Sequence, residues 1–153
     1  MTKPYFVYVT YIRSTPEKVW AALTDPVAVS KYWFNMTVEC PFTPGSPWAL
    51  KYDDGRVADT GEILEADPPR RLVIRWRNEF KPELKAEGYS RCTITIELAE
   101  YYPGMGGKAV KLTVEHGLEG EGGKFIEAVS GGWPKVLSNL KSYLESGDVA
   151  FKE

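Results

Sequence analysis

The sequence predicts an α+β domain in which an antiparallel β-sheet of about six strands packs on one long C-terminal α-helix. In the segment Lys124–Gly147, apolar residues recur every three or four positions, which is the repeat of one helix face. Several earlier segments alternate apolar and polar residues and are separated mostly by short turns, as in an antiparallel sheet. A length of 153 residues is enough for one sizeable core, so we expect a single domain over residues 1–153.

The first strand is predicted at Tyr5–Arg13, where nearly every residue is β-branched or aromatic. Two short helices should follow it. The segment Ser14–Glu17 has the hydroxyl, proline and glutamate pattern of a helix start, and Asp25-Pro26 ends this helix and caps the next. The inward faces are predicted to be Val19, Trp20 and Leu23, then Val29, Tyr32 and Trp33. Prolines punctuate Phe34–Pro47, so we expect a loop there.

The remaining strands are predicted from alternation of apolar and polar residues. They are expected at Trp48–Tyr52, Gly61–Ala66, Leu72–Arg77, Arg91–Tyr101 and Lys108–His116. The expected turns are Asp54-Gly55, Asp67–Pro69 and Pro103–Gly107, with a polar surface connection at Asn78–Tyr89 and a loop at Gly117–Gly123. Because the late strands alternate, one face of the sheet should be exposed to solvent, and the long helix should cover the other.

The C-terminal helix is predicted to begin at Lys124 and to end before Gly147. Its apolar face consists of Phe125, Ile126, Val129, Trp133, Val136, Leu137, Leu140 and Leu144. Its polar face consists of Lys124, Glu127, Lys135, Asn139, Lys141 and Glu145. Gly131-Gly132 and Pro134 weaken the helix, but the apolar stripe keeps its phase, so we expect one helix kinked near Ser130 to Pro134.

Composition argues against several classes of function. A formal net charge of −2 favours neither nucleic acid nor an anionic membrane. No apolar run approaches the ~20 residues needed to span a bilayer, so we expect no membrane insertion. The start of the chain has no signal-peptide pattern, which predicts a cytoplasmic location. Cys40 and Cys92 form no Cys-x-x-Cys motif, and we expect no metal and no cofactor.

Four parts of the chain resemble a known family when they are taken together: Ser14–Pro26, Trp33, Gly61–Trp76 and Gly132–Glu145. Their order and spacing are similar to those of START-like domains (the SRPBCC superfamily, with a START/Bet v-like helix-grip fold). Within that superfamily, the chain resembles the family similar to the C-terminal domain of the activator of the heat-shock-protein-90 ATPase. The resemblance implies a curved sheet wrapped around the long helix, with a cavity between them. Related domains carry lipids, polyketides, plant hormones or other apolar molecules, and some catalyse aromatic-ring cyclisation.

Aromatic residues make up 13% of the chain, and many fall on faces predicted to point inward. Core packing explains most aromatic residues at such positions, and a lined pocket is the alternative. Trp133 favours the pocket, because it lies beside Gly131-Gly132, where side-chain volume is missing. The candidate ligand-binding residues are Trp33, Trp48, Leu50, Trp76, Ile94, Ile96, Leu112, His116, Trp133 and Leu137. Arg75, Arg77 and Arg91 are interpreted as outer-face or rim residues.

His116 is the only histidine, so neither a pair of histidine ligands nor a catalytic triad can be recognised. A hydrogen-bonded structural histidine is the favoured interpretation. The alternative is a polar contact at the cavity mouth, or a general base paired with an acid such as Glu62.

We therefore expect a protein that binds a small hydrophobic or amphipathic molecule, and we assign no catalytic residue. An enzyme of cyclase, dehydratase or hydrolase type using the same cavity is the second hypothesis. A chaperone-interacting protein with a role in the stress response is the third. We do not expect chaperone activation, because the activator has a separate N-terminal domain that this sequence lacks. A homodimer is left open.

Overall fold

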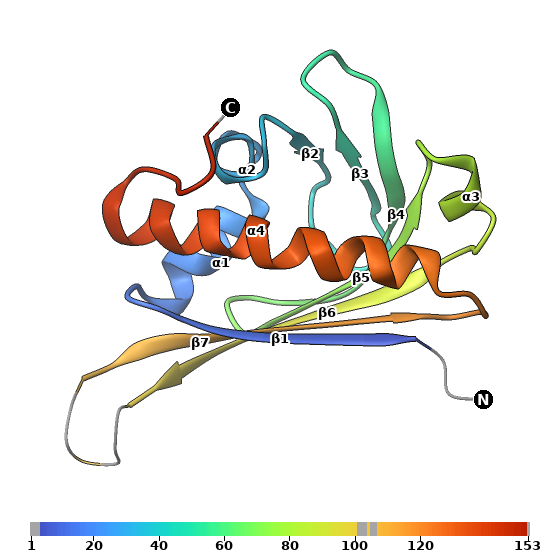
Figure 1. The fold of residues 1–153 in the computed structure, drawn as a ribbon. Helices are drawn as coiled ribbons and strands as arrows, with labels where there is room; N and C mark the ends of the chain where they lie inside the picture. The colour runs from blue at the N-terminus through green and yellow to red at the C-terminus, as the bar shows by residue number, and fades with distance from the viewer. Residues whose placement is uncertain (1–3, 101–103, 105–106, 153) are drawn as a thin grey trace.

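The computed structural model describes residues 4–100, 104 and 107–152, and its described strands form one antiparallel sheet beside a long helix (Figure 1). The strand order is β1-β7-β6-β5-β4-β3-β2, with seven strands in the sheet. The strands are β1 (Tyr5–Ile12), β2 (Thr37–Glu39), β3 (Pro47–Lys51), β4 (Val57–Asp67), β5 (Arg71–Asn78), β6 (Ser90–Ala99) and β7 (Ala109–Leu118). The helices are α1 (Pro16–Thr24), α2 (Pro26–Tyr32), α3 (Pro82–Lys85) and α4 (Lys124–Ser146).

Helix α4 lies across one face of the sheet, and the β3–β4 hairpin rises beside it (Figure 1). The two short helices α1 and α2 cover the part of this face nearest the C-terminal half of α4. This arrangement confirms the predicted α+β helix-grip fold. The core therefore lies between the inner face of the sheet and α4, where alternate strand residues such as Ile94, Leu112 and Val114 are almost completely buried.

Two short elements differ from the predictions. Strand β2 lies within the segment predicted as a loop, and α3 lies within the segment predicted as a polar connection. Each is only three or four residues long, too short for a periodic sequence pattern, and β2 exists because it pairs with β3. Strand β4 also begins earlier than expected, at Val57. The predicted strand residue Tyr101 and most of the predicted turn at Pro103–Gly107 lie outside the described residues.

The predicted ends of three helices are largely confirmed. The Asp25 carboxylate accepts a hydrogen bond from the Ala28 N–H and caps α2. Helix α1 is capped by Thr15 rather than by Ser14, because the Thr15 hydroxyl accepts the Lys18 N–H. Gly147 ends α4 with φ 83°, a left-handed conformation that glycine adopts at low cost.

Helix α4 is continuous from Lys124 to Ser146 through its two internal glycines and Pro134. One assignment on its polar face is wrong, because Asn139 is only 1% exposed. The Asn139 side chain donates to the carbonyl of Tyr32 and exchanges hydrogen bonds with the backbone of Phe151. The segment after α4 folds back over this position, so the Asn139 amide is buried where it forms hydrogen bonds with the backbone of two other segments.

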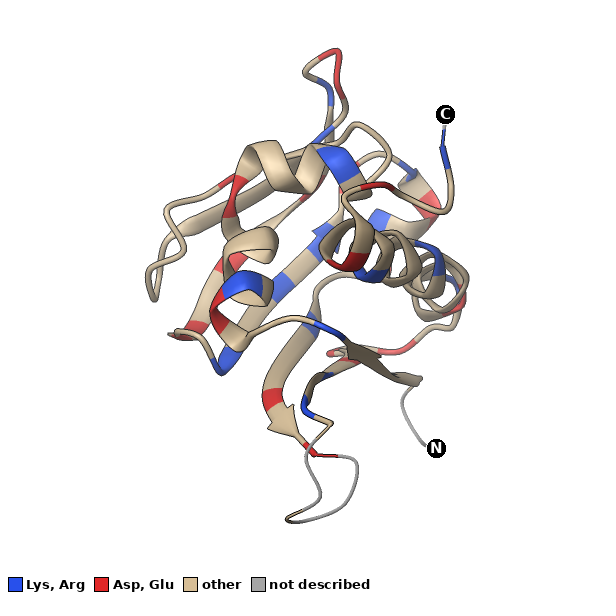
Figure 2. Cartoon of the chain, turned by 90° about the vertical axis from the view of Figure 1, so that its left-hand side faces the viewer, with Lys and Arg blue, Asp and Glu red and all other residues tan. Residues whose placement is uncertain are grey.

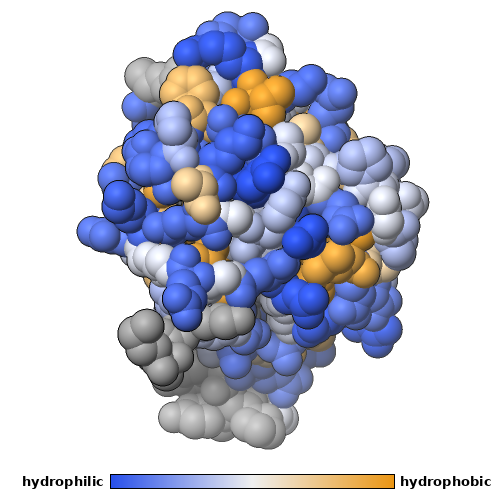
Figure 3. Space-filling model, turned by 90° about the vertical axis from the view of Figure 1, so that its right-hand side faces the viewer, coloured by the Kyte–Doolittle hydropathy of each residue, from blue (hydrophilic) through white to orange (hydrophobic). Residues whose placement is uncertain are grey.

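Acidic and basic residues are interspersed on the face shown in Figure 2, in keeping with the near-neutral charge of the chain. In the part of the chain that the structure describes, no helix is both long and apolar enough to cross a membrane. Figure 3 shows the end of the molecule where α3 and the start of α4 lie. Its surface is mostly hydrophilic, with small hydrophobic patches.

Candidate functional site

A cavity of about 200 Å³ lies between the N-terminal half of α4 and the strands β3, β4 and β5. Helix α3 and the segment after α2 complete its wall. Its lining is mainly aromatic and aliphatic: Trp33, Met36, Leu50, Tyr52, Ala58, Asp59, Trp76, Asn78, Leu84, Phe125, Ala128, Val129, Gly132, Trp133 and Val136. A mostly apolar lining with a few polar groups is the usual character of a small-molecule site.

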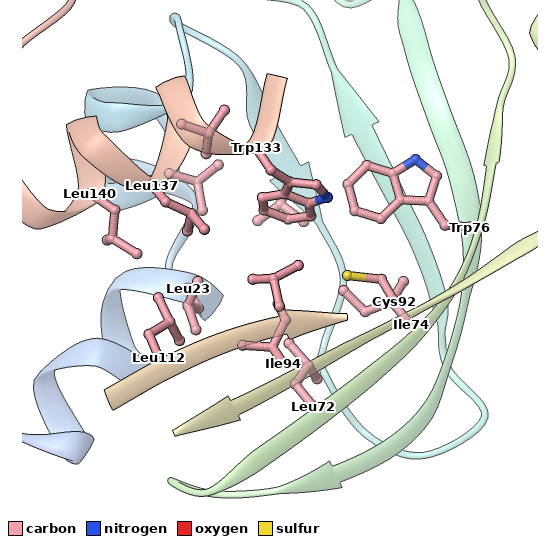
Figure 4. Packing of buried hydrophobic residues seen from close by; sticks show 14 of the residues in the cluster. Leu23, Leu72, Ile74, Trp76, Cys92, Ile94, Leu112, Trp133, Leu137 and Leu140 are labelled. Atoms are coloured by element: carbon pink, nitrogen blue, oxygen red, sulfur yellow. The ribbon is translucent and has the colours of Figure 1, made fainter. Parts of the chain in front are cut away.

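Packed tryptophan rings form the floor of this cavity. Trp133 projects from α4 towards the sheet and lies close to Trp76 of β5 (Figure 4). The ring centroids of Trp76 and Trp133 are 5.7 Å apart, and those of Trp33 and Trp133 are 5.3 Å apart, both with edge-to-face geometry. Trp48 also packs against Trp76, with ring centroids 4.6 Å apart. The rings support one another and leave only a void of about 20 Å³ beneath them.

The structure brings together only part of the predicted ligand-binding set. Trp33, Leu50, Trp76 and Trp133 line the cavity of about 200 Å³. Trp48 and Ile94 line the small void below it. The remaining predicted residues line neither space and pack within the core: Ile96, Leu112, His116 and Leu137. Strand alternation identifies the inner face of a sheet but not where along that face a cavity lies, so it does not separate residues that line the cavity from residues that pack in the core.

Several cavity residues were missed by the sequence analysis. Phe125 and Val129 belong to the predicted apolar stripe of α4 but were not assigned to a site. Leu84 comes from α3, which has too few residues to be predicted. Asp59 was missed because the strand was expected to begin at Gly61. Extending the alternation of β4 backwards by two residues would have placed an acidic residue on the inner face, which is the signal that could have revealed it.

His116 is fully buried, and both of its ring nitrogens make hydrogen bonds. The Trp133 indole N–H donates to Nδ1 at 3.0 Å. An indole nitrogen can only donate, so Nδ1 carries no proton and the neutral ring is protonated at Nε2. Nε2 lies 2.8 Å from the Ser90 hydroxyl, which donates in turn to the Trp76 carbonyl at 2.9 Å. This chain of hydrogen bonds connects α4 with β7, β6 and β5.

The surroundings of His116 favour the structural interpretation over a catalytic one. Burial lowers the pKa of His116 to about 3, because the charged ring would lose its hydration. Neither nitrogen is free to accept a proton from a substrate. The suggested pairing with Glu62 is wrong, since Glu62 lies opposite Arg75 in the sheet and shares its outer face with Arg75 and Tyr89.

The cavity instead contains a different acid. Asp59 is 7% exposed, and its carboxylate accepts a hydrogen bond of 3.1 Å from the Asn78 amide. Burial raises the pKa of Asp59 to about 6, and the hydrogen-bond donors of Trp76 and Asn78 oppose this shift only in part. The Trp76 indole N–H lowers the pKa of Asp59, although the geometry of this contact falls short of a hydrogen bond. The N–H has no other hydrogen-bond partner among the described residues.

The outer face of the sheet carries the three arginines as predicted. Arg75 makes a bidentate pair with Glu119 and lies over the Tyr89 ring at 4.0 Å, while Arg77 pairs with Glu79. Arg91 lies opposite Arg75 on the neighbouring strand. Among the residues that the structure describes, no group of three or more His, Cys, Asp or Glu side chains could hold a metal ion.

The family model described as "Activator of Hsp90 ATPase homolog 1-like protein" matches residues 13–145. The chain belongs to this family. The match runs from the end of β1 almost to the end of α4, so it includes every residue that lines the cavity. No curated protein sequence matches the chain.

Solved structures share the fold at low sequence identity. The Aha1 dimer from Colwellia psychrerythraea is 18% identical with a TM-score of 0.72, and the match covers 94% of this chain and 98% of that one. CalU16 from Micromonospora echinospora is 23% identical with a TM-score of 0.68, covering 94% and 77%. An HSP90 activator from Plasmodium falciparum is 22% identical with a TM-score of 0.67, covering 92% and 95%. At these identities the likeness concerns the fold alone.

Proposed function

We propose that this member of the family binds a small hydrophobic or amphipathic molecule in the cavity between α4 and strands β3 to β5. The observation that carries the proposal is the cavity itself: about 200 Å³ of space beside the aromatic rings of Trp33, Trp76 and Trp133. A ligand of complementary shape would remove the apolar side chains of this lining from water and stabilise the complex by hydrophobic burial.

The two adjacent glycines of α4 provide a matched pair of variants. Gly132 lines the cavity, and a Cβ atom added there meets nothing within 4 Å. Gly131 is exposed and does not line the cavity, and its added Cβ is equally unobstructed. Leucine at either position favours the helix by up to ~1 kcal/mol relative to glycine. Only the substitution at Gly132 should place new side-chain volume in the cavity.

Binding of the fluorescent apolar probe N-phenyl-1-naphthylamine is measured for wild-type protein and for each of these variants. We expect saturable binding to the native protein, with quenching of tryptophan emission, because the probe would lie against the tryptophan floor. G132L should weaken binding at least about tenfold, whereas G131L should leave it unchanged and serve as the control for helix stabilisation. Probe binding only to acid-loosened or denaturant-loosened protein, or equal binding to G131L and G132L, would contradict the proposed function.

A chaperone-directed activity is the second candidate, and the observation that favours it is that two proteins of the same fold are named Aha1 and an HSP90 activator. We expect such an activity to use the outer surface of the protein and not the cavity. The two candidates are therefore separated by measuring the ATPase rate of an Hsp90 chaperone with wild-type protein and with G132L. Stimulation that is equal in both would support the chaperone function and leave the cavity without a role in it.

A further inference from the structure

Two polar groups in the cavity wall are incompletely satisfied, and both belong to the same pair of strands. The Asp59 carboxylate on β4 has one protein hydrogen bond, from Asn78, its partner in the sheet register. The indole N–H of Trp76, two residues before Asn78 on β5, lowers the pKa of the same carboxylate without reaching hydrogen-bond geometry. It has no other hydrogen-bond partner among the described residues, and Trp76 is 4% exposed. A buried donor without a partner is costly and uncommon in folded proteins.

We infer that this corner of the cavity recognises a hydroxyl group of the ligand, which donates to the Asp59 carboxylate and accepts from the Trp76 indole N–H. The inference rests on the proposed function and specifies the ligand class for the same cavity: an alcohol or a phenol with an apolar body. The apolar body would lie against Trp33 and Trp133, which line the same cavity.

Other functional groups satisfy this corner less well. A carbonyl oxygen can accept from Trp76 but offers no proton to Asp59. An ammonium group can donate to Asp59 but cannot accept from Trp76. A ligand carboxylate would be repelled by the Asp59 carboxylate in surroundings of low dielectric constant. A hydroxyl both donates and accepts, so one group of the ligand satisfies both residues of the protein.

Water is also a hydroxyl donor and acceptor, and the same reasoning predicts that it occupies this corner when no ligand is bound. An apolar ligand that displaces the water leaves both polar groups unsatisfied. A ligand hydroxyl replaces the hydrogen bonds of the water and keeps the apolar contacts. The preference for a hydroxyl should therefore appear as a difference between ligands with the same carbon skeleton.

The test uses indane, 1-indanol and 1-indanone, which differ only at one carbon atom. Dissociation constants are measured by NMR titration of protein with ¹⁵N-labelled tryptophan, and the Trp76 indole signal is assigned by its loss in W76F. We expect 1-indanol to bind wild-type protein about tenfold more tightly than either relative, which corresponds to ~1.4 kcal/mol. With 1-indanol the Trp76 N–H proton should keep the downfield position of a hydrogen-bonded donor, and with indane it should move upfield, because indane displaces the water and offers no acceptor.

The variant D59N makes the test specific to the carboxylate. An amide at this position has the same shape and can present an N–H donor to the ligand, so the variant should bind 1-indanone at least as well as 1-indanol. D54N, in the exposed turn between β3 and β4, is the matched control and should keep the wild-type order. A wild-type preference for 1-indanol that persists in D59N would overturn the inference.

The two proposals can fail separately. If all three compounds bind with equal affinity, the cavity binds apolar molecules, but the hydroxyl recognition is wrong. If none binds and the apolar probe also fails to bind, the proposed function and the inference are both wrong.

Discussion

Asp59 is a carboxylate buried among aromatic side chains, and its burial lowers the stability of the folded chain at neutral pH. Folding raises the pKa of Asp59 from its ordinary value of 3.8 to about 6. Below pH 3.8 the Asp59 carboxyl is protonated in both the folded and the unfolded chain, and it lowers the stability of the fold only slightly. As the pH rises through 6, the unfolded chain ionises more readily than the folded one, and stability is lost. A group that destabilises the fold at neutral pH is a reasonable candidate for a functional residue.

The substitution D59N should therefore stabilise the protein at pH 7, by about 2–3 kcal/mol for a shift of about two pKa units. The gain should fade as the pH falls towards 4, where the wild-type carboxyl is protonated. Urea unfolding at pH 7, 5 and 4 measures it. D54N is the control, and we expect it to lower the stability slightly instead of raising it. The contacts with Arg56 lower the pKa of Asp54, so its exposed carboxylate favours folding slightly. A D59N protein less stable than wild type at pH 7 would contradict the argument.

Among the structural elements, α4 has an N-terminus that its own sequence does not cap. Gly123 precedes the helix and offers no side chain. Glu87, from the segment after α3, supplies the cap: its two carboxylate oxygens accept the backbone N–H groups of Lys124 and Phe125 at 3.1 and 3.0 Å. Negative charge at this position also complements the helix dipole. Because Leu84 and Phe125 line the cavity, this contact connects two parts of its wall.

Removal of this cap in E87A should lower the free energy of unfolding by about 1–2 kcal/mol, because two N–H groups lose their acceptor and the helix dipole loses its counter-charge. E87Q keeps one acceptor oxygen without the charge and should lie between E87A and wild type. The control is E83A on the exposed side of α3, expected to change stability by less than about 0.5 kcal/mol. Chemical denaturation measures all three, and equal effects of E87A and E83A would show that the cap has no energetic importance.

In the whole molecule, the hydrogen bonds of His116 connect the sheet with helix α4. Burial lowers the pKa of His116 from 6.5 to about 3. The unfolded chain therefore takes up a proton at higher pH than the folded one, so the contribution of His116 is complete above pH 6.5 and is lost as the pH falls towards 3. Protonation of Nδ1 would also replace the acceptor of the Trp133 N–H with a donor.

In wild-type protein, Asp59 offsets much of this acid destabilisation between pH 6 and 4, because its pKa is shifted in the opposite direction. D59N removes the offset, so its stability should fall by about 3 kcal/mol from pH 6.5 to 4, and wild type should change much less. Urea unfolding followed by near-UV and far-UV circular dichroism tests this, and the two signals should be lost together if the helix and sheet separate in one step. Parallel acid profiles of wild type and D59N would contradict the prediction.

Features that depend on residues close together in the sequence were predictable from the sequence. The apolar stripe of α4 and the alternation of β6 and β7 are periodic patterns, and they identify which face of each element is buried. The cap at Asp25 and the end of α4 at Gly147 are local conformational preferences. These patterns are sufficient for an antiparallel sheet covered by one long helix, because a sheet with one apolar face needs a cover and only one element is long enough to provide it. The curved helix-grip arrangement was implied by the resemblance to START-like domains.

Contacts between distant parts of the chain set which polar residues are buried and which apolar residues line the cavity. Asn139 and Asp59 look like surface residues in the sequence, and each is buried because segments far along the chain cover it. The cap from Glu87 and the buried indole N–H of Trp76 beside Asp59 likewise depend on contacts between distant elements. The alternation of β4 can place Asp59 on the inner face of the sheet, but how deeply a residue is buried and which hydrogen bonds it makes are properties of contacts between distant segments, which local patterns do not contain. The periodic patterns of the sequence therefore specify the layers of this protein, and the packing between the layers sets the position and the chemistry of its cavity.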